Sequence, residues 1–245
     1  MKKIIKLCIL GLLTVITVIF GVITGMGYKL YCDALDNKPL SQAVSEIQGK
    51  ADYTELDELP QIYLDAVLAV EDHRFYSHFG IDLIASARAA WNDILAGAFV
   101  EGGSTITQQL AKNMFFSQKK TLLRKAAEAF MAVRIEREYD KEQILELYVN
   151  SIYFGSGYYS VKDACNGYFG IEPKEMDDYQ CTLLAGIPNA PSVYAPTENP
   201  DLAQQRQRQV VDKMVKYGYL DEEGEKAVWE SASADFLQPD LQIAA

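Results

Sequence analysis

The sequence predicts an all-α protein in which one mainly helical domain follows a single transmembrane helix. Residues 7–28 carry no charged side chain, and residues 56–218 place apolar side chains at helical spacing without a convincing run of alternating β-branched residues. The chain has 245 residues, of which 49% are hydrophobic, and this is enough to bury one sizeable core. We therefore expect one folded domain with appendages.

The N-terminal apolar run, Leu7 to Tyr28, is long enough as a helix to cross a hydrocarbon core of about 30 Å. It is longer than the apolar part of a usual signal peptide, and no small-residue cleavage motif follows it. We therefore interpret residues 1–28 as an uncleaved anchor and not as a cleaved signal peptide. Lys2, Lys3 and Lys6 precede the run, and positive residues tend to stay in the cytoplasm. We expect a single-pass protein of the cell membrane with a cytoplasmic N-terminus and an extracytoplasmic catalytic domain.

The remainder of the chain divides into three parts. Residues 29–55 mix charge, glycine and proline and are interpreted as a membrane-proximal linker with one short helix. The folded domain is expected over residues 56–218. The tail, residues 219–245, is predicted to hold one short helix near residues 222–231.

Two helix boundaries inside the domain have clear signals. Asp140 followed by Gln143 has the form of a capping box and predicts a helix start. Asn199 before Pro200 predicts another start, and Gly218 is a suitable stop for that helix.

The composition limits the ligands and cofactors. A net charge of -11 and a pI near 4.7 argue against nucleic acid as a partner, because such proteins need an extended positive surface. An anionic ligand would have to meet a local basic patch. None of the four cysteines has the spacing of a zinc site, and we favour free buried thiols at Cys165 and Cys181 over a disulfide between them.

A first candidate segment contains the adjacent acids Glu71 and Asp72 among apolar and aromatic residues. A carboxylate there could be partly desolvated, which would suit it to proton transfer. The alternative is a capping pair at a helix end. His73 and His78 are five residues apart and miss the spacing of the helical zinc motif, so a structural hydrogen bond is the better interpretation of His78.

A second candidate segment is GGSTITQQLAKN, in which two glycines permit a tight turn before a helix. Ser104 is expected to cap that helix and to lie on one polar face with Gln108 and Lys112. An ordinary capped amphipathic helix and a site for an anion or a sugar explain this pattern equally well.

A third candidate segment concentrates positive charge in an otherwise acidic chain. Seven basic residues against two glutamates lie between residues 112 and 137; the basic residues are Lys112, Lys119, Lys120, Arg124, Lys125, Arg134 and Arg137. One interpretation is a pyrophosphate clamp with Glu128 at its edge. The other is an intrahelical Arg124–Glu128 ion pair, which contributes about 0.3 to 0.5 kcal/mol.

Five segments in this order carry a resemblance to a known family: EDHRFYSHFG, GGSTITQQLAKN, RKAAE, KEQILELYVNSIYFGSGYYSVKDACNGYFG and LLAGIPNAPSVYAP. Together they resemble the signature segments of the family 51 glycosyltransferases, the peptidoglycan polymerases. The similarity spans residues 56–218. Because the chain ends soon afterwards, it looks like the monofunctional form of the enzyme.

The resemblance implies a lysozyme-like helical fold with a cleft and a small apolar subregion that associates with the membrane. Residues 81–100, with Trp91 and Phe99, match that subregion. By position in the motifs, Glu71 matches the catalytic base and Glu128 the second catalytic carboxylate. Residues that match substrate-binding positions are Ser104, Gln108, Lys112, Lys120, Arg124 and Asn150. Two residues depart from the pattern: the family often has a basic residue at the position of Ala127 and usually has glycine at the position of Ser160.

The resemblance also implies a reaction. Lipid II would be polymerised into glycan strands by inverting transfer onto a C4 hydroxyl, with release of lipid pyrophosphate. The implied partners are lipid II, lipid-linked glycan, the membrane and other cell-wall synthesis proteins. A divalent cation, Mg or Mn, held by Glu128 at the donor pyrophosphate is a candidate cofactor. One alternative is a lysozyme-like lytic enzyme, but the basic patch and the anchor argue against it. The other is an inactive membrane-anchored scaffold, and the presence of Glu71 and Glu128 argues against that.

Overall fold

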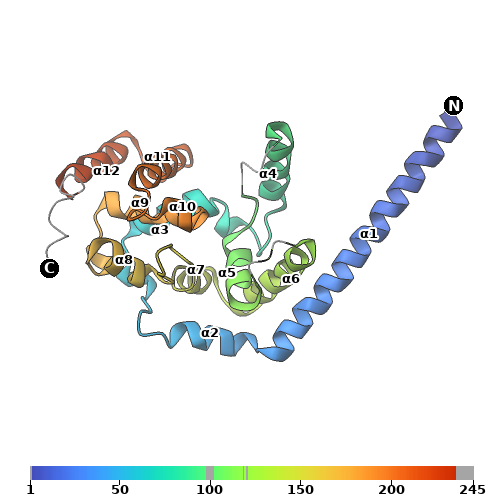
Figure 1. The fold of residues 1–245 in the computed structure, drawn as a ribbon, viewed down its shortest axis with the longest axis horizontal. Coiled ribbons are helices and arrows are strands. Elements are labelled where there is room, and N and C mark those ends of the chain that lie inside the picture. The colour runs from blue at the N-terminus through green and yellow to red at the C-terminus, as the bar shows by residue number, and fades with distance from the viewer. Residues whose placement is uncertain (1, 98–101, 118, 120, 236–245) are drawn as a thin grey trace.

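A long apolar helix extends away from the folded domain (Figure 1). The computed structural model describes residues 2–97, 102–117, 119 and 121–235. The long helix, α1 (Lys2–Asn37), has a mean hydropathy of 2.7 in its most apolar window, none of which is buried, and among the described residues it alone is long and apolar enough to cross a membrane. It does not end at Tyr28 but continues to Asn37, because no proline interrupts it before Pro39.

The segment expected as a linker is folded onto the domain. Helix α2 (Leu40–Gln48) starts directly after Pro39 and buries four apolar side chains of one face: Leu40, Ala43, Val44 and Ile47. After α2, the backbone of Thr54 exchanges hydrogen bonds of 2.9 and 2.8 Å with the Asn150 side chain, and Asp52 accepts a hydrogen bond from Ser160. This part of the chain therefore belongs to the compact structure.

The other described elements are also helical. The α-helices are α3 (Gln61–Glu71), α4 (Leu83–Ala96), α5 (Ile106–Phe115), α6 (Leu122–Glu138), α7 (Lys141–Val149), α8 (Val161–Phe169), α9 (Asp178–Gly186), α10 (Pro191–Tyr194), α11 (Pro200–Lys216) and α12 (Glu222–Asp235). Short 3-10 helices lie at Leu56–Glu58, Phe75–Ser77, Pro173–Glu175 and Ile187–Asn189. No strand occurs among these residues, which confirms the predicted all-α class.

The predicted helix boundaries are confirmed. Asp140 caps α7 and forms a capping box with Gln143. Asn199 precedes α11, and Gly218 adopts a φ of 78° just after that helix, a conformation that glycine adopts at low cost.

The core joins two groups of helices. Helix α3 packs against α9 and α11, while α5 packs against α6 and α7. Their shared apolar cluster includes the fully buried rings of Tyr63, Phe75 and Tyr148. Cys165 and Cys181 lie in the same cluster as free thiols, and burial raises the pKa of both.

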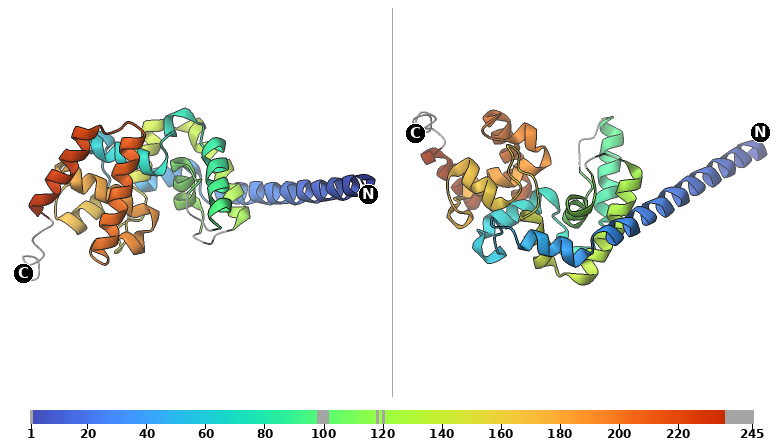
Figure 2. Two further views of the ribbon diagram at one scale, coloured as in Figure 1. Left: turned by 90° about the horizontal axis from the view of Figure 1, so that it is seen from above. Right: turned by 60° about the horizontal axis from the view of Figure 1, so that its bottom comes forward.

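Helix α4 projects from this body in Figure 1 and in the right-hand view of Figure 2. Four large apolar side chains on it are exposed: Leu83, Ile84, Trp91 and Leu95, at 76, 60, 62 and 69%. An apolar surface of this kind on a projecting helix is suited to the membrane boundary. Phe99 lies outside the described residues.

Candidate active site

A cleft of about 1090 Å³ opens where α3 ends. Its lining comes from the end of α3, from α4, from residues 102–105, from α5 and α6, and from α11. Six of the predicted site residues line it together: Glu71, Ser104, Gln108, Lys112, Arg124 and Glu128. Lys120 lies outside the described residues.

Glu71, the last residue of α3, presents one carboxylate oxygen that is fixed and one that is not. Oε2 accepts a hydrogen bond of 2.7 Å from the amide of Gln109, whose own oxygen accepts from the Tyr148 hydroxyl at 3.3 Å. Oε1 is buried and has no hydrogen-bond partner in the described part of the chain. This oxygen is therefore available to accept a proton from a bound substrate.

The two residues behind Glu71 were not assigned by sequence reasoning. The motif contains adjacent glutamines, and helical spacing and motif position both indicated Gln108, not Gln109. In the fold, the Gln108 carbonyl oxygen accepts from the Thr105 backbone N–H at 3.1 Å, whereas Gln109 reaches Glu71. Burial and the nearby Glu71 charge raise the pKa of Tyr148, so its hydroxyl stays protonated and donates.

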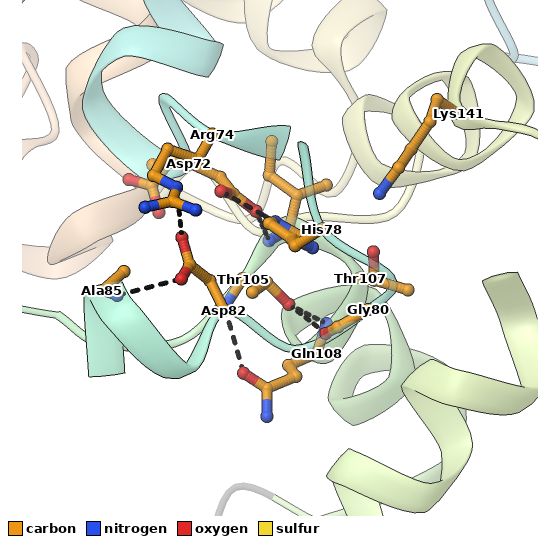
Figure 3. A network of polar contacts seen from close by, with 12 residues as sticks. Asp72, Arg74, His78, Gly80, Asp82, Ala85, Thr105, Thr107, Gln108 and Lys141 are labelled. Carbon is orange, nitrogen blue, oxygen red and sulfur yellow. Dashed lines mark hydrogen bonds and ion pairs between the residues drawn. The ribbon is translucent and has the colours of Figure 1, made fainter. Parts of the chain in front are cut away.

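Asp72 has a different role from its neighbour Glu71 (Figure 3). It is buried at the end of α3, and its two oxygens lie 3.0 and 2.9 Å from Nε2 of His78. Oδ2 also accepts from the backbone N–H of Ile106 at 3.0 Å. Asp72 thus fixes the end of α3 to the start of α5, and the structural role expected for His78 is confirmed.

The turn into α5 is held by Thr105 and not, as predicted, by Ser104. The Thr105 side chain accepts from the Gln108 backbone N–H at 3.1 Å and donates to the Gly80 carbonyl at 2.7 Å (Figure 3). Because Thr105 occupies the capping position, Ser104 is free to face the cleft, where its hydroxyl accepts from the Lys125 ammonium. The predicted cap was wrong by one residue because both hydroxyl residues fit the local sequence pattern of a helix cap.

A group of cations surrounds Glu128 on α6. Its Oε1 lies 3.3 Å from an Arg124 guanidinium nitrogen and its Oε2 lies 3.1 Å from the Lys125 ammonium. Lys112 lies in the same group, and its pKa is lowered by burial and by the charges of Arg124 and Lys125, which outweigh the opposing effect of Glu128. Three cations against one carboxylate leave positive charge for an anionic ligand.

Lys125 was part of the predicted basic patch but was not assigned to the site. Its spacing of three residues from Glu128 was the available signal, since residues at i and i+3 share a helix face. Sequence reasoning also missed the wall that α11 contributes. Arg206, buried against the cleft, donates to the Gly186 carbonyl at 3.3 Å and to Gln209 at 2.9 Å.

Asn150, a predicted substrate-binding residue, does not line the cleft. Its side-chain amide donates to the carbonyl oxygens of Thr54 and Glu146 at 2.8 and 2.9 Å, and its oxygen accepts from Thr54 at 2.9 Å. It is fully buried. Its polar atoms therefore hold residues 50–55 against α7. This contact joins segments far apart in the chain, so the sequence motifs could not predict it.

The described residues fit a resident metal poorly. Both oxygens of Glu128 are paired with cations, and among these residues no group of three or more His, Cys, Asp or Glu side chains is placed to hold a metal ion. Mg²⁺ prefers carboxylate and phosphate oxygens that are not shared with ammonium or guanidinium groups at such short range.

A proton acceptor and a cationic cluster in one cleft are the parts needed to transfer a group away from a phosphate-type leaving group. Comparison with known proteins identifies the family. A family model described as Transglycosylase matches residues 36–215, so the chain belongs to the transglycosylase family. The match begins at the end of α1 and includes residues 36–55 of the segment expected as a linker.

The curated relatives are penicillin-binding proteins. The chain is 46% identical over 165 residues to penicillin-binding protein 1F of Bacillus subtilis (strain 168), covering 67% of this chain and 23% of that protein. It is 46% identical over 177 residues to penicillin-binding protein 1A of Aquifex aeolicus (strain VF5), covering 72% and 24%. The chain thus spans about a quarter of the length of these relatives. A crystal structure of penicillin-binding protein 1A from Haemophilus influenzae aligns with 72% of this chain and 17% of its own, at 22% identity and a TM-score of 0.43.

Proposed function

We propose that the chain is a membrane-anchored peptidoglycan glycosyltransferase that polymerises lipid II into glycan strands. The observation that carries the proposal is the free, buried Oε1 of Glu71 in the same cleft as the cations around Glu128. Family membership and the relatives named above support the same reaction.

In the proposed reaction, Glu71 accepts the proton of the acceptor sugar's C4 hydroxyl. At the same time, the oxygen of that hydroxyl bonds to the anomeric carbon of the donor. The bond from that carbon to the lipid pyrophosphate breaks, and the pyrophosphate leaves with the electron pair. A single displacement inverts the anomeric centre, so Glu71 acts as a base and forms no covalent intermediate. Gln109 positions the carboxylate by holding its other oxygen.

The departing pyrophosphate would be stabilised by Lys112, Arg124 and Lys125, and Lys120 stays a candidate for the same role. Charge that develops on the leaving oxygens is best stabilised by cations already in place. Glu128 holds Arg124 and Lys125 where they are needed. Ser104 and Gln108 line the same part of the cleft and are proposed to contact the bound substrate.

The membrane placement supports a substrate that carries a lipid. We propose that Lys2, Lys3 and Lys6 remain in the cytoplasm and that the catalytic domain lies outside, with α4 at the membrane boundary. Labelling of single cysteines introduced at Lys3 and at Lys174 with an impermeant maleimide in intact cells tests this orientation. Labelling at position 3 but not at position 174 would reverse it.

The function is tested by giving the purified full-length protein lipid II in a membrane mimic. Polymeric glycan, absent with Glu71→Gln, is the expected product. Release of fragments from preformed peptidoglycan without polymer would identify the lytic enzyme instead. Binding of lipid II without turnover in wild-type protein would identify the scaffold.

The proposal needs no divalent cation at Glu128, because Arg124 and Lys125 already engage its two oxygens. Polymerisation measured with EDTA and with added Mg²⁺ or Mn²⁺ decides the point. An unchanged rate is the expected result from the donor set around Glu128.

A further inference from the structure

An apolar groove of about 760 Å³ lies between α1 and α6. Its lining includes Phe20 and Ile23 of α1 and Phe130, Val133, Arg134 and Arg137 of α6. The residues from α1 include the outer part of the uncharged run that ends at Tyr28. The groove therefore opens at the depth where a membrane meets the domain.

The two helices that form the groove pack against each other and approach closely at Gly27. A Cβ placed on Gly27 would lie 2.5 Å from the Ala126 Cβ and 3.2 Å from the Leu123 carbonyl oxygen, so the two backbones meet at Gly27. Beside this point the ring of Phe130 packs edge-on against Tyr28, with ring centroids 5.3 Å apart. From there α1 extends away from the domain (Figure 2). The groove, a wedge between the two helices, reaches Phe20, whose side chain is 70% exposed.

Helix α6 separates this groove from the catalytic cleft. At about 100° per residue, Arg124, Lys125 and Glu128 fall on one face of α6, and Ala126, Phe130 and Val133 fall on roughly the opposite face. The lining residues of the two cavities agree with this, because none is shared between them. A molecule in the groove would lie behind the helix that carries the cationic cluster.

The groove combines apolar walls with two guanidinium groups. Arg134 pairs with Glu138, an exposed contact between neighbouring turns that a competing anion can replace at little cost. Arg137 is exposed and has no carboxylate partner among the described residues. A ligand that matches this lining has a long apolar chain and an anionic head.

We propose that the groove binds an anionic phospholipid of the surrounding membrane, with an acyl chain along Phe20, Ile23 and Val133 and its phosphate at Arg134 and Arg137. A wedge open to the bilayer must be filled by apolar matter, since water in it would be poorly hydrogen-bonded. The bilayer supplies acyl chains, and the arginines select among their headgroups by charge. The polyprenyl chain of the proposed substrate is a weaker fit because its pyrophosphate would lie across α6 from Glu71.

The test uses the full chain in detergent, titrated with phosphatidylglycerol or phosphatidylcholine and measured by native mass spectrometry. The protein should retain phosphatidylglycerol in preference to phosphatidylcholine. Arg134→Gln with Arg137→Gln should weaken its binding about tenfold, in line with the attraction of juxtamembrane cations for anionic lipid. Arg134→Lys with Arg137→Lys should retain most of the binding. Lys29→Gln with Lys38→Gln removes the same charge outside the groove and should change little.

Location is tested with a phosphatidylglycerol that carries a photoreactive acyl chain. Crosslinks should fall on peptides of α1 and α6 around Ile23 and Val133. Equal retention of phosphatidylglycerol by wild type and the double glutamine variant, or crosslinks elsewhere, would overturn the proposal. So would displacement of phosphatidylglycerol by a polyprenyl phosphate that then crosslinks at the same peptides. None of these readouts depends on polymerisation, so the inference and the proposed function fail separately.

Discussion

Glu71 and Asp72 are adjacent in sequence at the end of α3, but their side chains have different hydrogen-bond partners. Asp72 is saturated by His78 and by the α5 backbone, whereas Glu71 keeps one oxygen without a partner among the described residues. Asp72 is therefore the helix-end feature of the pair, and Glu71 is the proposed base.

Replacing Glu71 with Gln should lower the polymerisation rate by about 10² to 10⁴-fold and leave the melting temperature nearly unchanged. The amide keeps the size of the side chain but cannot accept the proton. Asp72→Asn should instead lower the melting temperature, because it weakens a buried hydrogen-bonded pair. Initial rates and thermal unfolding of both variants check this. Retention of more than about a tenth of the wild-type rate by Glu71→Gln would remove it from the base role.

Replacing Lys112 with Met should slow turnover without lowering the melting temperature at neutral pH. Burial lowers the pKa of Lys112, so the folded state binds this proton less tightly than the unfolded chain. Wild-type stability should therefore rise with pH from the lowered pKa up to the ordinary value of 10.5, and the variant should lose this rise. The exposed Lys174→Met serves as the control. A marked drop in melting temperature for Lys112→Met alone would contradict the prediction.

At the scale of elements, the contact between α1 and α6 depends on the absence of a side chain at one position. Gly27→Val should destabilise the protein by about 1 to 3 kcal/mol, because the new side chain has no room against Ala126. Gly25→Val is a matched control in the same helix, since nothing lies within 4 Å of a Cβ at Gly25. Thermal unfolding in detergent compares the two. Equal melting temperatures would mean that the helices do not meet at Gly27.

Helix positions were largely predictable because their signals are local. The capping box at Asp140 and the Asn199–Pro200 start were both found where the sequence placed them. The docking of residues 29–55 was not, because it depends on Asn150 and Ser160, which are about 100 residues away in the chain. The cap of α5 was wrongly placed at Ser104 instead of Thr105, and the contact between Glu71 and Gln109, the neighbour of Gln108, was not predicted, for a related reason. Each pair has similar chemistry, and only the folded backbone distinguishes its members.

For the whole molecule, the exposed apolar face of α4 predicts a second attachment to the membrane. In a chain lacking residues 1–19, Trp91→Ser with Leu95→Ser should weaken liposome binding with little change in melting temperature, because both side chains are already exposed. Val193→Ser with Leu202→Ser removes exposed apolar side chains away from α4 and should have little effect. Flotation with liposomes measures the difference. Equal binding by the two double variants would contradict a specific role for α4.

The anchor is joined to the domain at two separated places. One is the meeting of α1 with α6 at Gly27, and the other is the fastening of residues 50–55 to α7 through Asn150. A tether held at one point would allow the domain to swivel, but a second attachment removes that freedom. The height of the cleft above the bilayer then becomes a fixed dimension of the molecule. A sugar held at a set distance from its own lipid would arrive at Glu71 already at the right level, so less orientational search would precede each transfer.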